Sequence, residues 1–363
     1  MPTNQQSDDR RHGLVVDIHC HIYTAACEPL VRELQSPTAE PFDRFGGPST
    51  QYNKQHFADI RPQLTTPDVR LADMDRMGVD VQAISVAPPQ YYYWTPGHLG
   101  RRLARMENDH LAEIVAGHPD RFVGLGTVPM QDVEGAIAEL RYLASELGFR
   151  GIEICSNVAG DDLDDHRFLA FWEEVERLRL LVVIHPHGFT QGDRLTDYYL
   201  INVVGNPLDS TVAVSRLVFG GVLARHPALK ICVVHGGGYL PLYPYRMDHA
   251  WQVRPESRER IPRPPSTYLA RLYFDTVVFD PRQLANLVRW AGDDHVLLGT
   301  DYPYDMGETD PVGLLSRVPG LDTAGRERIM GANAARLLEL AGAGSRTGSP
   351  AGGRGTGGWT RWT

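Results

Sequence analysis

Eight short apolar runs between residues 14 and 300 constrain the fold of this chain more than any other feature. Most of these runs are continuous and rich in β-branched residues, which is typical of strands buried on both faces of a parallel sheet. We predict strands over Leu14–His19, Val79–Val86, Phe122–Thr127, Gly151–Cys155, Leu181–His185, Ile231–His235, Leu272–Thr276 and Val296–Thr300.

Amphipathic stretches separate these runs and predict the connecting helices. We expect helices over Pro67–Gly78, Asp132–Gly148, Phe168–Leu180, Asn206–His226, Asp280–Gly292 and Thr323–Leu340. Strands alternating with helices indicate an α/β fold, here a distorted (β/α)8 TIM barrel. A doubly wound open sheet is the main rival. The segment Ala25–Thr65 fits neither period, and its length indicates an insertion after the first strand, on the face where barrel active sites lie.

The composition is that of an ordinary globular protein, with 42% hydrophobic and 22% charged residues. We expect a single barrel domain over residues 13–341. Residues 1–12 and the Gly/Ser-rich tail 342–363 are predicted to be disordered, because they have too few aliphatic residues to bury. The net charge of −9 argues against a nucleic-acid-binding surface or an anchor for anionic membranes.

Four cysteines in 363 residues are too few for a disulfide scaffold. Cys20, Cys155 and Cys232 lie in or beside apolar runs, so we expect reduced, buried thiols. No C-x-x-C pair is present, which argues against a thiolate zinc site. No signal-peptide core and no run of 18 apolar residues is visible, so a cytoplasmic protein is expected.

Metal- and proton-competent side chains stand at the ends of four predicted strands. The first strand leads into His19 and His21, the fifth ends at His185, the sixth ends at His235, and Asp301 follows the eighth. The carboxyl ends of parallel barrel strands converge on one mouth. Two histidines two residues apart on an extended strand point the same way and can reach one ion. Imidazole and carboxylate ligands suit zinc and its first-row neighbours, so His19, His21, His185 and Asp301 are the predicted ligands.

Each of these signals taken alone also has an ordinary structural explanation. A single His-x-His pair is equally consistent with polar residues at a strand end, and His235 before three glycines with a structural histidine. Their coincidence at four strand ends favours a site. Asp17 is a candidate to fix an imidazole tautomer. The choice for His187 between lining the pocket and capping the next loop stays open.

The site motifs and several other segments share the pattern of a known family. They are His19-x-His21, His185, His235-Gly-Gly-Gly and Gly299-Thr-Asp301-Tyr-Pro, together with Pro67–Gly78, Arg121–Gln131, Gly220-Gly-Val, His226–Lys230 and Asp275-Thr. This pattern resembles the amidohydrolase superfamily, and more narrowly the amidohydrolase-related decarboxylases typified by 2-amino-3-carboxymuconate-6-semialdehyde decarboxylase. The resemblance covers most of residues 14–340.

The resemblance implies roles for the matching residues. His19, His21, His185 and Asp301 match the ligands of a single zinc, and His235 matches an acid/base histidine. Manganese stays an alternative, because nitrogen and oxygen sites accept both metals.

Three arginines are implied as substrate or interface residues. Arg61 falls where the family places an arginine for the substrate carboxylate, and a guanidinium suits that group. Arg246 matches an arginine that reaches across a homodimer into the neighbouring active site, and Arg254 is a further basic candidate. The fourth strand, Gly151–Cys155, has no lysine to be carbamylated, which implies a mononuclear site; Glu153 is either pocket-facing or structural.

Three residues depart from the family pattern. His187 stands where an aromatic residue is expected, Asn202 where a tryptophan is, and Tyr304 where a phenylalanine is. These changes make the pocket more polar, and His187 and Asn202 become candidate substrate-binding residues.

The predicted function is metal-dependent, non-oxidative decarboxylation of a small conjugated or aromatic carboxylic acid, with His235 or Asp301 as the proton donor. The alternative is a hydrolase or hydratase of the same superfamily, acting on a lactone, amide or ring-cleavage product. A non-catalytic barrel serving as a binding or scaffold protein is the third hypothesis. It requires a broken metal site, whereas all four ligands and His235 are present.

Overall fold

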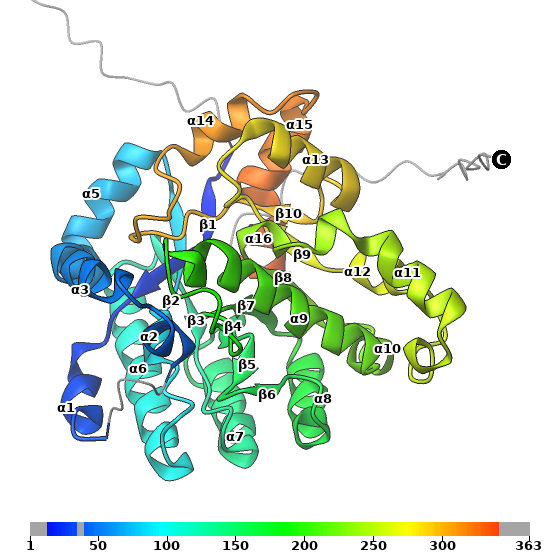
Figure 1. Ribbon diagram of the computed structural model, residues 1–363. Helices are drawn as coiled ribbons and strands as arrows, with labels where there is room; N and C mark the ends of the chain where they lie inside the picture. The colour runs from blue at the N-terminus through cyan, green and yellow to red at the C-terminus, as the bar shows by residue number, and fades with distance from the viewer. Residues whose placement is uncertain (1–12, 35–39, 341–363) are drawn as a thin grey trace, which may run out of the picture.

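A barrel of eight parallel strands forms the centre of the protein (Figure 1). The computed structural model describes residues 13–34 and 40–340, so both predicted disordered ends lie outside the described residues. The barrel strands are β1 (Val16–Ile22), β2 (Val81–Val86), β3 (Phe122–Gly126), β4 (Gly151–Cys155), β7 (Leu181–His185), β8 (Lys230–Val233), β9 (Tyr273–Asp275) and β10 (Val296–Leu297). Each strand pairs in parallel with the next one in this order. The short hairpin β5 (Asn157–Val158) and β6 (Asp161–Asp162) follows β4.

The sheet closes between its first strand and the segment that follows its last strand. The backbone N–H of Ile18 donates to the carbonyl of Leu298 at 2.9 Å, and that of His21 to Tyr302 at 2.8 Å. These bonds remove the free edges of the sheet. The predicted (β/α)8 barrel is therefore confirmed, and the open doubly wound sheet is excluded.

Helices surround the barrel, and their ends carry the expected signals. They are α5 (Pro67–Met77), α6 (Gly97–Gly117), α7 (Val133–Ser145), α8 (Leu169–Leu178), α9 (Asn206–Phe219), α10 (Val222–Arg225), α11 (Pro244–Val253), α12 (Pro265–Leu269), α13 (Pro281–Ala291), α14 (Pro311–Ser316), α15 (Thr323–Glu327) and α16 (Asn333–Leu337). Gly78 ends α5 in the left-handed conformation, and the side chains of Asp132 and Asp280 cap α7 and α13.

Two predicted helices are interrupted, and one long helix was not predicted. The stretch Asn206–His226 breaks at Gly221, whose φ of 79° ends one helix and starts another. The stretch Thr323–Leu340 contains a π-helical segment, η8 (Arg328–Ala332), between α15 and α16. The 21-residue α6 was missed although it packs on β3.

The insertion Ala25–Thr65 is helical where it is described, although its sequence fits neither period. It contains the 3-10 turn η1 (Ala25–Cys27) and the helices α1 (Glu28–Val31), α2 (Pro41–Arg44), α3 (Ser49–Asp59) and α4 (Arg61–Thr65). Gly47, in the left-handed conformation at φ 51°, lies so close to Thr196 that a Cβ would be 2.2 Å from its carbonyl oxygen. The insertion therefore packs tightly on the segment that follows β7.

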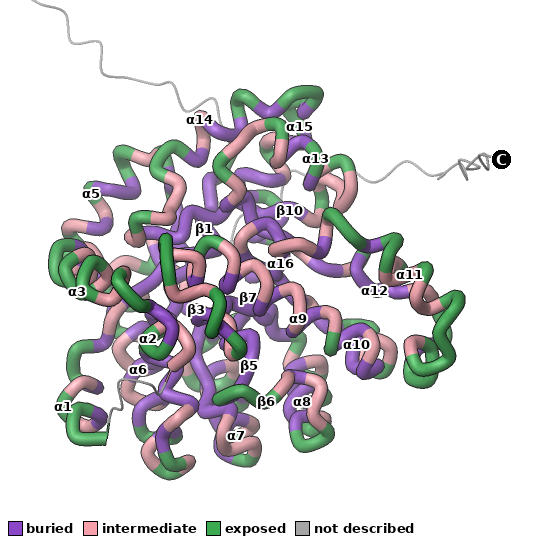
Figure 2. Tube along the Cα trace, in the orientation of Figure 1, coloured by how far each residue is buried: buried purple, intermediate pink, exposed green. Residues whose placement is uncertain are grey.

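Burial follows the pattern that the apolar runs predict. Every residue of β1, β2, β4 and β7 is buried, and Figure 2 shows the exposed green segments on the outer helices and loops. Val16, Ile18 and Val183 belong to a cluster formed mainly by strand residues, whereas Ile84 and Ile152 pack with the helices. Cys20, Cys155 and Cys232 are buried, as expected, and so is Cys27. Among the described residues, none of the helices has both the length and the apolar character needed to cross a membrane.

Candidate active site

Five polar side chains meet at the carboxyl ends of the strands. His19 and His21 lie in β1, His185 ends β7, His235 follows β8, and Asp301 follows β10. The Asp301 carboxylate lies 3.3 Å from Nε2 of His21, 3.5 Å from Nε2 of His19 and 3.5 Å from Nε2 of His235. We call these five residues the ligand cluster. The structure thus brings together the five side chains that the sequence places at the strand ends.

Several imidazole nitrogens of the ligand cluster have no hydrogen-bond partner in the protein. The rings of His185 and His19 are 5.0 Å apart, as are those of His185 and His21. Nε2 of His19, Nε2 of His21, both nitrogens of His185 and Nδ1 of His235 are buried and make no hydrogen bond. Buried polar atoms without a partner are costly, so a converging set of them indicates a ligand. Three or four imidazole nitrogens with one carboxylate fit a divalent cation.

The distances alone do not choose four ligands out of the five residues. One ligand atom each from His19, His185, His235 and Asp301 all lie within 4.8 Å of one another. His21 is equally close to Asp301, at 3.3 Å. The side chain of His235 is 16% exposed, whereas those of His19 and His21 are fully buried. His235 is thus the histidine of the cluster that is most open to solvent.

The electrostatics of the cluster favour a cation. Burial lowers the pKa of His19, but the charges of Asp301 and Asp275 outweigh it and raise that pKa to about 9. Burial and the neighbouring histidines hold the pKa of His185 well below its ordinary value. The two carboxylates thus favour a positive charge at His19, and the same field attracts a metal cation.

Two hydrogen bonds fix the imidazole orientation on β1. The carboxylate of Asp275 lies 2.6 Å from Nδ1 of His19, and the carbonyl of Val86 accepts from Nδ1 of His21 at 3.2 Å. Protons on both Nδ1 atoms leave each Nε2 lone pair directed at the cluster. Asp275 was not predicted as a site residue, although it ends the seventh barrel strand. Its signal was the same as that of the residues in the ligand cluster, a polar residue at a strand end.

Asp17 and Glu153 accept hydrogen bonds from groups that surround the ligand cluster. Asp17 accepts hydrogen bonds from the backbone of His19 and from both the backbone and the hydroxyl of Thr300. The hypothesis that Asp17 fixes an imidazole tautomer is therefore wrong, because its carboxylate accepts from backbone N–H groups and from the side chains of Thr300 and Gln82, and from no imidazole ring. Glu153 accepts hydrogen bonds from Ser85 and Tyr91, and its carboxylate lies 3.8 Å from Nδ1 of His21. Glu153 is therefore next to the cluster.

The three glycines after His235 are required by close packing. His235 itself is left-handed, at φ 55°, and Gly236, Gly237 and Gly238 also have positive φ. A Cβ on Gly236 would lie 2.4 Å from Val278, and one on Gly238 would lie 2.3 Å from the carbonyl of Pro207. The turn therefore holds His235 against the neighbouring strand ends in one backbone conformation.

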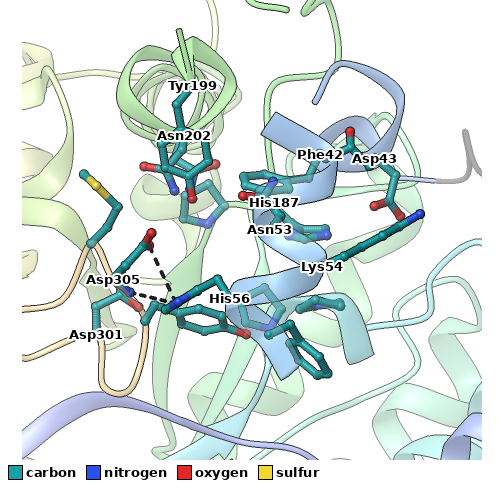
Figure 3. Close-up of a pocket in the computed structure, with 18 of the residues that line it drawn as sticks. Phe42, Asp43, Asn53, Lys54, His56, His187, Tyr199, Asn202, Asp301 and Asp305 are labelled. Atoms are coloured by element: carbon teal, nitrogen blue, oxygen red, sulfur yellow. Dashed lines mark hydrogen bonds and ion pairs between the residues drawn. The ribbon is translucent and has the colours of Figure 1, made fainter. Parts of the chain in front are cut away.

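A cavity of about 320 Å³ opens beside the ligand cluster, with His185 and Asp301 in its lining. Much of its wall comes from the insertion, in particular from Phe42, Asn53, Lys54 and His56. Figure 3 shows these side chains on the helices of the insertion and Asn202 on the helical segment that follows β7, with Tyr199 from the turn before that segment. The insertion after the first strand thus shares this cavity with His185 and Asp301.

The structure separates the predicted substrate-binding residues into two groups. His187 and Asn202 line the cavity, and burial lowers the pKa of His187 to about 4, so this imidazole is neutral at pH 7. Arg61 does not belong to the lining; it pairs with Glu28 at 2.8 Å. Lys54, which the sequence did not single out, is the one lysine or arginine in the described lining.

The other two arginines also lie outside the lining. Arg246 is exposed on α11, and Arg254 pairs with Glu256 at 2.5 Å. Within one chain, therefore, neither residue contacts the cavity.

Comparison with known proteins identifies the family. The profile described as amidohydrolase matches residues 16–340. A 2-amino-3-carboxymuconate-6-semialdehyde decarboxylase of Dictyostelium discoideum is 38% identical over 78% of this chain and 79% of its own length. A gamma-resorcylate decarboxylase of Rhizobium is 30% identical over 77% of this chain and 89% of its own. A 5-carboxyvanillate decarboxylase of Novosphingobium aromaticivorans, solved with bound manganese and 3-methoxy-4-hydroxy-5-nitrobenzoic acid, superposes with a TM-score of 0.78 at 25% identity, over 90% of this chain and 97% of that one. The chain belongs to the amidohydrolase family.

Proposed function

We propose that the protein is a metal-dependent, non-oxidative decarboxylase of a small conjugated or aromatic carboxylic acid. The observation that carries this proposal is the ligand cluster, whose unpartnered imidazole nitrogens surround one carboxylate at the edge of a cavity. The names of the relatives support loss of carbon dioxide over hydrolysis. A hydrolase or hydratase is the second choice, and the polar lining residues His187 and Asn202 are what favours it.

His19, His21, His185 and Asp301 would hold the cation. When bound, it would act as a Lewis acid toward the oxygens of the substrate. Zinc and manganese both suit three nitrogens and one oxygen, and manganese is supported by the solved relative that contains it. His235 is left out of the proposed ligand set because its side chain is the most exposed of the four histidines.

His235 and Asp301 are the proposed proton carriers. In decarboxylation the bond between the carboxylate carbon and its neighbour breaks, carbon dioxide leaves, and the electron pair stays on the neighbouring carbon. That carbon then takes up a proton. His235 lies 3.5 Å from Asp301, so a proton can pass between the two groups and reach the substrate from either one.

A homodimer is proposed from the surface around Arg246. Tyr243, Tyr245 and Val253 are between 55% and 72% exposed on and beside α11, and Leu242 next to them is 58% exposed. Such a group of exposed apolar side chains marks an interaction surface. We propose that a second copy covers it and that Arg246 enters the partner's cavity. Mixed dimers of Arg246→Ala and His235→Ala subunits should recover activity if the arginine acts in trans.

Direct contact between Arg61 and a substrate carboxylate stays a prediction, since Arg61 would first have to leave Glu28. A cytoplasmic location likewise stays an expectation, consistent with the four free cysteines.

The proposed function is tested by carbon dioxide release from metal-loaded protein. The substrates are 2-amino-3-carboxymuconate semialdehyde, gamma-resorcylate and 5-carboxyvanillate, and His235→Ala is the control. We expect release from at least one substrate and a loss of about 100-fold or more in the control. No release from fully metal-loaded protein would contradict the proposal and move the search to lactone and ring-cleavage substrates.

A further inference from the structure

Arg70 is a charged side chain in the interior of the protein. It lies on α5 and is fully buried. Its hydrogen-bond acceptors among the described residues are both neutral: Nη1 donates to the side-chain oxygen of Gln82 at 2.7 Å, and Nη2 donates to the carbonyl of His21. Nε has no partner. Burying a guanidinium without an acidic acceptor is costly, and an apolar side chain of similar size would suit the core better. The position of Arg70 therefore calls for a further reason.

That position is beside the line along which the barrel closes. Here the end of β1 meets the segment after β10, and we call this line the barrel seam. The N–H of His21 donates to the carbonyl of Tyr302 at 2.8 Å, and the N–H of Asp301 donates to the carbonyl of His19 at 2.8 Å. The barrel seam thus sets the main chain of three members of the ligand cluster.

Arg70 contacts both sides of the barrel seam. On one side it donates to the carbonyl of His21, and on the other its guanidinium lies over the ring of Tyr302, 4.7 Å from the ring centroid. The hydroxyl of Tyr302 donates to Asp73 at 2.6 Å, and Asp73 lies three residues after Arg70 on the same helix. The helix α5 therefore holds the residue that follows Asp301 at two points.

The shape of the guanidinium explains why an arginine fits here. Gln82 on β2 fixes one Nη atom, and the carbonyl of His21 accepts from the other, while the flat face of the group rests on Tyr302. A planar fork can make these three contacts at once, whereas the ammonium of a lysine is a point charge without a plane.

We propose that Arg70 is a positioning residue of the metal site, which fixes the main chain at the barrel seam so that His21 and Asp301 face one cation. Its hydrogen bonds go to a carbonyl and to Gln82, not to a metal-binding atom, so it acts through the backbone of His21 and through Tyr302. Metal ligands have to be held within about 0.5 Å of the productive geometry, and groups behind the ligands do this. The inference rests on the proposed metal-dependent function and deepens it.

The test is the metal affinity of the full chain, measured without substrate by competition between the protein and a chelator for Mn²⁺. Arg70→Met keeps a long unbranched side chain but removes the fork. We expect its Mn²⁺ affinity to fall about 10- to 100-fold, as when a group behind a metal ligand is removed. Arg70→Lys keeps the charge and the stem without the plane, and its affinity should still fall about tenfold. It carries the test if Arg70→Met does not fold.

Leu143→Ala is the matched control for stability. Leu143 is fully buried on α7 in the apolar core, so its loss should lower the Tm by leaving a cavity but should keep the wild-type Mn²⁺ affinity. The visible absorption of the Co²⁺-loaded protein reports the ligand geometry, and it should change in both Arg70 variants but not in the control.

Wild-type Mn²⁺ affinity in a folded Arg70 variant would overturn the positioning role. A loss of affinity no larger than that of Leu143→Ala at the same drop in Tm would overturn it as well, because the effect would then be one of general stability. A wild-type protein that binds no metal would instead contradict the proposed function itself.

Discussion

The ligand cluster lies at one side of the cavity, and another part of the cavity wall is formed by the insertion and by the turn that contains Tyr199. We call this second part the insertion wall, and different parts of the fold build it and the cluster. The cluster is carried by the ends of barrel strands, where hydrogen bonds between neighbouring strands fix each backbone position. The insertion wall is carried by the insertion and by a turn that contains two left-handed tyrosines. The metal-binding chemistry thus depends on the barrel that the family shares, whereas the insertion wall lies on segments that can vary without disturbing it.

The largest effect is expected at the centre of the ligand cluster. Asp301→Asn removes the charge that faces His19, His21 and His235, so metal affinity and activity should both fall. We expect a loss of about 1,000-fold in carbon dioxide release, measured beside metal content. Asp305→Asn, on the cavity but outside the cluster, should keep its metal. Full activity of a metal-free Asp301→Asn protein would contradict the role of the ligand cluster in binding the metal.

A smaller loss of metal affinity is expected at Asp275, which contacts His19 but is not itself in the ligand cluster. Asp275→Asn weakens the contact that orients the His19 ring, and metal affinity should fall about 10- to 100-fold, as measured by competition with a chelator. Asp17→Asn is the matched control, because Asp17 bonds only backbone and polar groups beneath the cluster. It should lower the Tm more than the metal affinity. A larger loss of metal affinity in Asp17→Asn than in Asp275→Asn would show that Asp17 and not Asp275 supports the metal.

At the insertion wall of the cavity we expect changes in KM only. Lys54→Met removes the one lysine or arginine of the described lining, so the KM of an anionic substrate should rise about fivefold and the salt dependence of KM should weaken. Arg61→Met tests the predicted contact between Arg61 and a substrate carboxylate, and a KM near the wild-type value would show that Arg61 stays paired with Glu28. A larger effect at Arg61 would show that it leaves Glu28 to bind substrate.

The smallest effect lies outside both regions, on α8. The hydrogen bond from Arg177, assisted by Arg141, lowers the pKa of Glu174 from 4.5 to about 2, although partial burial raises it. A lowered folded-state pKa stabilises the protein above the unfolded value, and this contribution is lost as the pH falls from 4.5 to about 2. Since both arginines are exposed, we expect only about 1 kcal/mol. The free energy of unfolding of Glu174→Gln, measured with denaturant, should differ less between pH 7 and pH 3 than that of the wild type. An equal difference in the two proteins would assign the acid sensitivity to other groups.

The sequence predicts the ligand cluster well because its signals are local. His19, His21, His185, His235 and Asp301 each stand at the end of a buried run, and barrel geometry brings such ends together. Asp275 was missed although it lies in the predicted strand Leu272–Thr276, because that segment was read for its apolar content.

The insertion wall was not predictable in the same way, because tertiary contacts decide its structure. The helix α3 has no buried residue among its eleven, so no apolar period marks it. The left-handed turn is formed by Tyr198 and Tyr199 and not by glycine, so the sequence carries no signal for it. Arg61 and Glu28 are 33 positions apart in the sequence, so a short motif could not predict their ion pair.

Metal titration of activity tests the central claim most directly. Metal-free protein is titrated with manganese or zinc, and carbon dioxide release from an aromatic acid is followed at each step. The account predicts that the rate rises in proportion to added metal and levels off at one ion per chain, with no rise in Asp301→Asn. Activity that is independent of metal, or that requires two ions per chain, would contradict a single metal held by the ligand cluster.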